Sequence, residues 1–244
     1  MARRPTPPPS SAGMPGGASN PPPPESSAGK SERERIVSAF MALLAEKPIE
    51  QIGFAEIAQR AGVSLAELRG QFDSTLRILG AQMKDIDRKV LAGNDPDMAE
   101  EPPRERLFDV LMRRIEVLDP YKEAVRSLAH SAGRNPGLAL ALNGLAVRSQ
   151  QWMLTAADIS ASGPRGLVRS QGLTLLFASV LRSWLHDDDP GHARTMAALD
   201  RALARGQRWS GFLDDLCAIP ACVCRRRSRR RRPGADADEV SIAV

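Results

Sequence analysis

The sequence lacks most of the features that mark secreted, sheet-rich or membrane-spanning proteins. There are only 3 cysteines among 244 residues, all near the C-terminal end, and an odd number without an export signal argues for a reducing cytoplasm. Aromatic residues make up only 4%, which is low for a protein built from sheets. The longest uncharged apolar run, 172–181, is well short of the roughly 20 residues that a bilayer-spanning helix needs. We therefore expect a cytoplasmic protein without a transmembrane segment.

The net positive charge of the chain comes from its two ends. The net charge is +5, of which residues 1–29 contribute +1 and residues 225–244, with seven arginines, contribute +4. Residues 30–224 are therefore neutral overall, and the basic pI is no evidence that the folded part binds nucleic acid. Residues 1–29 are rich in Pro, Gly and Ser, so we expect this segment and the Arg-rich tail 220–244 to be disordered.

Between these ends the hydrophobic pattern has a helical period, and no stretch alternates with period 2 over six residues. Ser31 with Glu34 and Ser64 with Glu67 have the spacing of capping boxes, which predicts two helix starts. Gly62 is expected to end a short helix in the left-handed conformation that glycine tolerates. The fold class is all-α, with about nine helices expected over 31–47, 54–60, 64–72, 74–93, 104–118, 120–132, 136–157, 165–187 and 191–216.

The segment 53–72, GFAEIAQRAGVSLAELRGQF, has the layout of a helix-turn-helix. Ala58 lets the two helices approach closely, Gly62 makes the turn, and Val63 and Leu68 fill the space between the helices. With an amphipathic helix before it and a long helix after it, this block resembles the DNA-binding domain of TetR-type transcriptional regulators. A three-helix packing unit with no role in DNA binding would use the same small residues, so both interpretations stay open.

The resemblance implies that the second short helix contacts DNA, through Ser64, Leu65, Arg69 and Gln71. Arg69 and Gln71 are the long hydrogen-bond donors of that helix. Glu67 and Asp73 add repulsion toward phosphates, and residues 30–80 contain as many acidic as basic side chains. The charge pattern for DNA binding is therefore weak, although the helix-turn-helix layout is good.

The larger block has a second resemblance. An aliphatic helix, a Trp-Leu pair, an acidic turn and a helix ending in Leu-Asp-Arg, within 175–203, are similar to the ubiquinone-biosynthesis accessory family called Coq-nine. That family has a TetR-like fold but binds lipid and a partner enzyme, and the resemblance implies an apolar pocket. We expect it to be elongated, with room left by small residues such as Gly144, Gly172 and Ala178. Its predicted lining is Trp152, Phe177, Leu181 and Trp184, although such residues also form ordinary cores.

No residue pattern supports catalysis, a metal or a cofactor. His130 and His186 have no nucleophile that they could activate. Cys222 and Cys224 lack the second ligand pair of a structural zinc site, and three consecutive acids at 187–189 cannot all face one ion. We therefore expect no enzyme activity, no catalytic residue, no metal site and no cofactor.

The predicted organisation is a disordered arm (1–29), a helix-turn-helix domain (30–92), a helical ligand-binding and dimerisation domain (104–219) and the Arg-rich tail (220–244). The leading hypothesis is a homodimeric TetR-like regulator that binds operator DNA and senses a hydrophobic small molecule or lipid. The alternative is a Coq-nine-like lipid-binding accessory protein with a vestigial helix-turn-helix and a peripheral membrane contact. An apolar stripe near the end of the last helix would serve a second subunit, a membrane surface or the core, through Ala204, Trp209, Phe212, Leu213 and Leu216.

Overall fold

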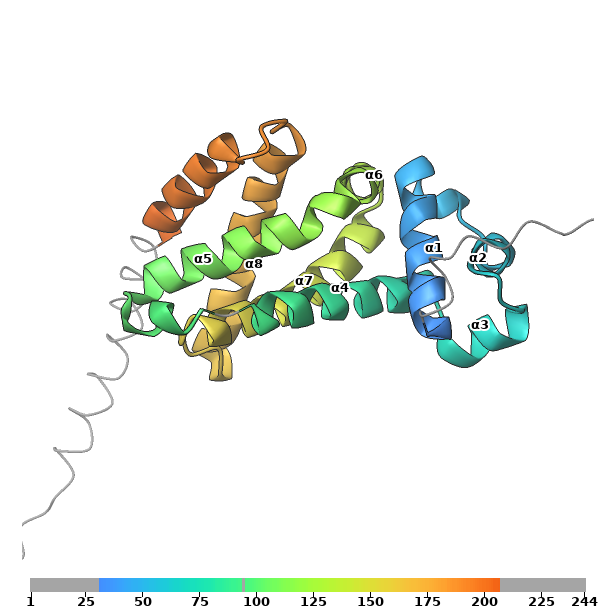
Figure 1. The fold of residues 1–244 in the computed structure, drawn as a ribbon, viewed down its shortest axis with the longest axis horizontal. Coiled ribbons are helices and arrows are strands. Elements are labelled where there is room, and N and C mark those ends of the chain that lie inside the picture. Colours follow the sequence, from blue (N-terminus) through green and yellow to red (C-terminus); the bar gives the residue numbers. More distant parts are fainter. Residues whose placement is uncertain (1–30, 94, 207–244) are drawn as a thin grey trace, which may run out of the picture.

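The computed structural model describes residues 31–93 and 95–206. Within these ranges the chain is helical and has no strand, which confirms the predicted all-α class. Eight helices are labelled in Figure 1, and a further helix runs over 193–206. The labelled helices are α1 (Glu32–Glu46), α2 (Phe54–Ala61), α3 (Leu65–Gln71), α4 (Thr75–Ala92), α5 (Pro103–Leu118), α6 (Lys122–Arg134), α7 (Pro136–Ala156) and α8 (Gly163–Leu185).

The local signals in the first third of the chain act as the sequence predicts. Ser31 and Ser64 each form a complete capping box, with Glu34 at the start of α1 and with Glu67 at the start of α3. Gly62 ends α2 with φ +65°, in the left-handed region where a side chain would be strained. The first residue of α2, Phe54, is 42% exposed, whereas Ile57, Ala58 and Ala61 of the same helix are buried.

Two hydrophobic clusters divide the interior. The first contains the buried side chains of α1, α2 and α3, together with Ile78 and Leu79 of α4. The second begins with Ile86 and Val90 of α4 and continues through α5, α7, α8 and the 193–206 helix. We call residues 31–81 the head and residues 82–206 the body. Figure 1 shows the head at one end of an elongated molecule, with α4 running from it along the body.

The head is also attached to the body through α6. Ala124 of α6 is buried in the first cluster, and Leu128 packs against it. The Ser127 hydroxyl donates to the Lys47 carbonyl over 3.1 Å, and the Ser131 hydroxyl donates to Glu50 Oε2 over 2.9 Å. The head therefore rests on α6 as well as on α4.

Several predicted features lie outside the described residues: the arm 1–29, the tail 220–244, the three cysteines and the apolar stripe beyond Ala204. In the part of the chain that the structure describes, none of the helices combines the length and hydrophobicity needed to cross a membrane. In the same part, no group of three or more His, Cys, Asp or Glu side chains is arranged to hold a metal ion.

Candidate functional site

The helix-turn-helix presents α3 to solvent and holds it by one buried side chain. Leu68 is 2% exposed and is the only residue of α3 in the core of the head. The turn is fixed by hydrogen bonds from the Val63 amide to the Ala58 carbonyl, over 3.0 Å, and from the Gly62 amide to the Gln59 carbonyl, over 3.2 Å. The opposite side of α3 is therefore available for contact with another molecule.

All four predicted DNA-contacting residues are exposed to solvent. Leu65 is 54% exposed, and Ser64, Arg69 and Gln71 are exposed as well. The Ser64 hydroxyl accepts a hydrogen bond from the Glu67 amide over 3.2 Å, so it orients the start of α3. Arg69 is paired with Asp73 one turn later, and both side chains are about 70% exposed. Such an exposed ion pair is weak, so Arg69 can exchange Asp73 for a phosphate or a base at little cost.

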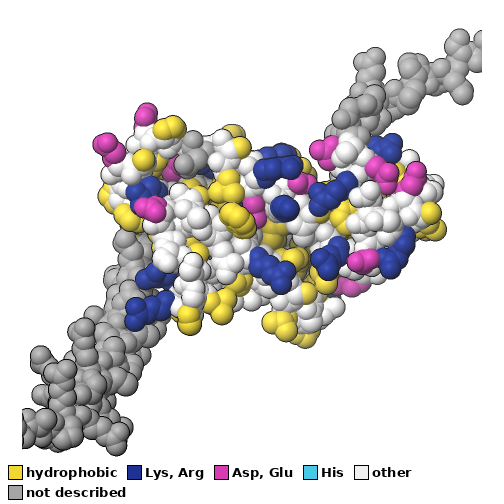
Figure 2. Space-filling view, turned by 90° about the horizontal axis from the view of Figure 1, so that it is seen from below, with side chains coloured by type: hydrophobic (Ala, Val, Ile, Leu, Met, Phe, Trp, Pro, Cys, Tyr) yellow, Lys and Arg dark blue, Asp and Glu magenta, His cyan; other side chains and the backbone are white. Residues whose placement is uncertain are grey.

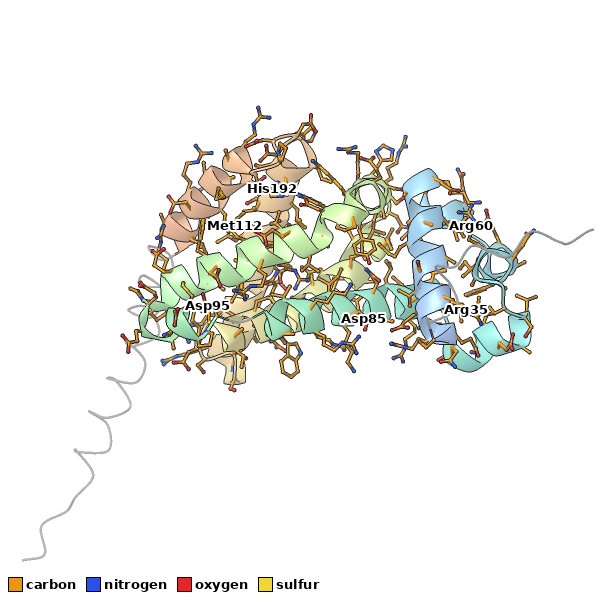
Figure 3. All side chains as sticks on the ribbon, viewed as in Figure 1. Arg35, Arg60, Asp85, Asp95, Met112 and His192 are labelled. Atoms are coloured by element: carbon orange, nitrogen blue, oxygen red, sulfur yellow. The ribbon has the colours of Figure 1, made fainter. Side chains whose placement is uncertain are left out.

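Other basic residues of the head differ in how they are engaged. Arg60 of α2 donates two hydrogen bonds to Glu46, over 2.8 and 2.9 Å, and Lys47 pairs with Glu56 over 2.5 Å. Arg35 of α1 lies on the side of the head toward α3 (Figure 3). The pKa of Glu67 is lowered, first by the hydrogen bond from the Ser64 amide, and the positive charge of Arg35 contributes. Arg35 thus partly offsets the acidic residue of α3.

The four predicted pocket residues do not come together. Phe177 and Trp184 are buried in the second cluster, and Leu181 packs against it, but Trp152 is 57% exposed. The Trp184 indole nitrogen donates to Asp119 Oδ1 over 2.9 Å, which ties the end of α8 to the end of α5. Because α7 turns Trp152 to solvent, this residue does not line an internal pocket with the other three.

The small residues expected to leave room for a ligand also lie on the outside. Gly144 of α7 and Gly172 and Ala178 of α8 are exposed, and a Cβ added at either glycine would meet no atom within 4 Å. An open hollow of about 470 Å³ lies elsewhere, where the head meets the corner between α6 and α7. Its lining contains none of the predicted pocket residues: Pro48, Glu50, Gln51, His130, Ser131, Arg134, Asn135 and Pro136.

A buried ion pair in the body was not predicted. Arg114 of α5 is 5% exposed and Asp87 of α4 is 7% exposed, and Arg114 Nη1 donates to Asp87 Oδ1 over 2.5 Å. The Ser149 hydroxyl of α7 donates to the same oxygen over 2.6 Å, so Asp87 joins three helices. Burial lowers the pKa of the Arg114 guanidinium, and the charge of Asp87 opposes that shift.

The sequence did contain a signal for this ion pair. The buried positions of α5 recur at helical spacing, and Arg114 occupies one of them between Leu111 and Ile115. A charged residue within an apolar stripe is buried at a cost unless it finds a partner. Asp87, next to Ile86 on α4, is that partner, but the pairing of α4 with α5 could not be read from the sequence.

The fold is that of TetR-family transcriptional regulators. A TetR regulator from Nitrosomonas europaea has a TM-score of 0.56 and 21% identity, covering 71% of this chain and 96% of that chain. One from a Rhodococcus species has a TM-score of 0.51 and 24% identity, covering 71% and 94%. A putative TetR-family regulator, also from Rhodococcus, has a TM-score of 0.50 and 22% identity, covering 70% and 98%.

No family model matches the sequence, and no curated protein matches it either. At these identities the structural likeness shows the fold alone. None of the comparisons supports the resemblance of the body to the Coq-nine family.

Proposed function

We propose that the protein is a cytoplasmic, homodimeric transcriptional regulator without enzymatic activity. It binds operator DNA through α3 and responds to an apolar ligand in the body. The observation that carries this proposal is the geometry of α3: one leucine and one capping box fix the helix, and its other side chains are free to enter a major groove. The fold, shared with TetR-family regulators, supports the same conclusion.

The side chains of α3 divide by the contact that each can make. Arg69 and Gln71 are long donors suited to guanine and adenine edges, and Leu65 offers an apolar contact to a thymine methyl. The Ser64 hydroxyl is engaged in the cap, so its role is to hold the helix at the angle that DNA requires.

Phosphate contacts would come from the neighbouring helices. Arg77, Lys84 and Arg88 are exposed on α4 at helical spacing. Figure 2 views the molecule from the side on which α4 lies, and Lys and Arg side chains spread there across the middle of the surface. The head has no net positive charge, so the basic residues of α4 would supply the positive charge that faces the phosphates.

A dimer is needed because one short α3 contacts only one half-site. The outer face of α7 and α8 suits a second copy of the chain, since Leu140, Leu167 and Leu175 are each more than half exposed there. Neither helix contains an acidic residue, and the exposed glycines at 144 and 172 permit close approach of another helix. Asn143 and Gln171 exchange two hydrogen bonds of 3.0 Å, which fix α7 against α8 and so the shape of this face.

DNA binding is tested by selecting a site from random duplexes and titrating it in a gel shift. Arg69→Ala should weaken binding by roughly 1–3 kcal/mol, the scale of a bidentate base contact. Arg60→Ala is the matched control, because Arg60 is an exposed arginine of the same motif that is already bound by Glu46. If no duplex is selected, or if the two variants bind equally well, α3 is not the recognition helix.

The dimer is tested by sedimentation of Leu175→Glu. This leucine is 63% exposed on α8, so a carboxylate should leave the fold intact and shift the protein to monomer. Leu65→Glu, at a leucine of similar exposure on α3, should stay dimeric. A dimeric Leu175→Glu protein would place the interface elsewhere.

A further inference from the structure

Arg114 has hydrogen-bonding capacity that the described residues do not use. One terminal nitrogen, Nη1, donates to Asp87, but Nε is buried and has no partner within residues 31–93 and 95–206. A guanidinium carries five N–H donors, and the edge formed by Nε and the other terminal nitrogen matches the two oxygens of a carboxylate. Arg114 therefore has one edge occupied by Asp87 and a second edge that can take a carboxylate.

Arg114 lies beside an aromatic ring in the part of the body that contains the second hydrophobic cluster. The guanidinium carbon lies 5.6 Å from the centre of the Phe177 ring, which is the geometry of a cation–π contact. Leu111, Ile115 and Met153 are completely buried in the same cluster. Methionine has three rotatable bonds and adapts easily to a new neighbour. A ligand that reaches this edge must therefore present an acidic group to Arg114 and hydrocarbon to the surrounding cluster.

We propose that the body binds the carboxylate of an apolar acid, with Arg114 as the residue that anchors it. This inference rests on the proposed function, because it specifies the chemical class of the ligand that the regulator senses. The Gln150 side-chain oxygen is also buried without a partner among the described residues, but it requires a donor. A carboxylate provides none, so Gln150 is not assigned to this contact.

The bound acid weakens the contact between Arg114 and Asp87, although the two carboxylates occupy different edges of the guanidinium. Asp87 and the incoming carboxylate would share one guanidinium in a site of low dielectric, where two like charges repel strongly. Asp87 belongs to α4, whose earlier residues Ile78 and Leu79 lie in the core of the head. The acid therefore loosens the link between α4 and α5, and through α4 it changes the position of α3 and weakens DNA binding.

The first test uses the unmodified protein and pairs of probes that differ only in the acidic group. Decanoate and 4-phenylbutyrate are compared with decanol and 4-phenylbutanol by isothermal titration calorimetry without DNA. Each acid should bind at least about tenfold more tightly than its alcohol, because the charge-assisted contact with two guanidinium nitrogens outweighs the repulsion from Asp87. Equal affinity within each pair, or no binding of either acid, overturns the proposal.

The second test locates the contact. Arg114→Gln should remove the preference for the acid, whereas Arg113→Gln should keep it, because Arg113 is the neighbouring arginine and pairs with Asp109. Retention of the preference in Arg114→Gln overturns the proposal. If that variant does not fold, the acid–alcohol comparison in the unmodified protein decides.

The third test separates this inference from the proposed function. Asp87→Asn should bind decanoate more tightly, since the repelling charge is gone, and decanoate should no longer reduce its affinity for DNA. Weaker or unchanged decanoate binding by this variant contradicts the repulsion. A protein that prefers the acids but selects no DNA would contradict the proposed function and leave the acid site standing, and the reverse result would do the opposite.

Discussion

Every side chain that is buried in the head is apolar, whereas the body encloses an ion pair, a further aspartate, serines, threonines and two glutamines in its interior. Apolar burial stabilises without regard to direction, so the core of the head does not depend on any single polar contact. A buried ion pair contributes little net stability, but it is sensitive to the loss of either partner. The proposed response to a ligand therefore belongs to the body, where one polar contact matters to stability, and not to the apolar core of the head.

The largest expected effect comes from breaking the ion pair of the body. Asp87→Ala leaves Arg114 buried without its counter-charge and should lower the free energy of unfolding by roughly 3–5 kcal/mol. The double variant Asp87→Leu/Arg114→Met removes both charges and should be close to the unmodified protein or more stable. Urea denaturation measures both. Equal losses in the single and double variants would show that packing volume matters at this position, and charge does not.

In the head, the loss of a buried side chain cannot be compensated by removing a partner. Leu68→Ala removes the one buried side chain of α3 and should cost roughly 2–5 kcal/mol, with loss of DNA binding because α3 is no longer held. Leu65→Ala, at an exposed position of the same helix, should change stability by less than about 0.5 kcal/mol. A normal unfolding curve for Leu68→Ala would mean that the capping box alone holds α3.

A smaller effect is expected at the cap. Ser64→Ala removes the hydroxyl that accepts from the Glu67 amide and should cost about 1 kcal/mol. The same replacement at Ser38, which is exposed within α1, should be nearly neutral. Thermal melts compare the two variants. A larger loss at Ser38 than at Ser64 would contradict the role given to the capping box.

The smallest effect depends on pH and lies in the body. The pKa of Asp187 is lowered in the folded protein, chiefly by the hydrogen bond from the Thr195 hydroxyl, 2.6 Å from Asp187 Oδ2. A carboxylate with a lowered pKa stabilises the fold above its unfolded pKa of about 3.9, and this contribution is lost as the pH falls through the folded value.

Asp187→Asn should therefore be less stable than the unmodified protein at neutral pH. The difference in free energy of unfolding between the two proteins should become smaller below about pH 4. Asp188→Asn is the control, because the Asp188 side chain is 97% exposed. Chemical denaturation at several pH values measures this difference. A difference that is constant with pH would show that the charge of Asp187 plays no part.

The sequence predicted the head more fully than the body because the signals in the head are local. Ser64, Glu67 and Gly62 fix a cap and a turn within a few residues, and no distant partner is needed. In the body, α7 carries apolar residues around much of its surface, so periodicity could not tell that Trp152 faces solvent and Val147 faces the core. Which face of α7 is buried depends on α4 and α8, which pack against α7.

The candidate sites follow the same division. Arg69 and Gln71 could be named from the sequence, since exposure on a short capped helix is a local property. The proposed anchor at Arg114 could not be named, because its buried neighbours Asp87 and Phe177 lie on other helices. A charge inside an apolar stripe is visible in one sequence, but its partner becomes visible only when the helices are packed.

The position of α4 in both hydrophobic clusters has a consequence for anyone who wishes to cut or recombine this protein. Ile78 and Leu79 stabilise one cluster and Ile86 and Val90 the other, along a single uninterrupted helix. Heating should therefore melt the two ends together, in one cooperative transition. A chimaera that exchanges only residues 31–81 between two such proteins would join two foreign halves of one helix. Exchange of 31–92 keeps the helix whole and moves the mismatch to the contacts of α4 with α5 and α7.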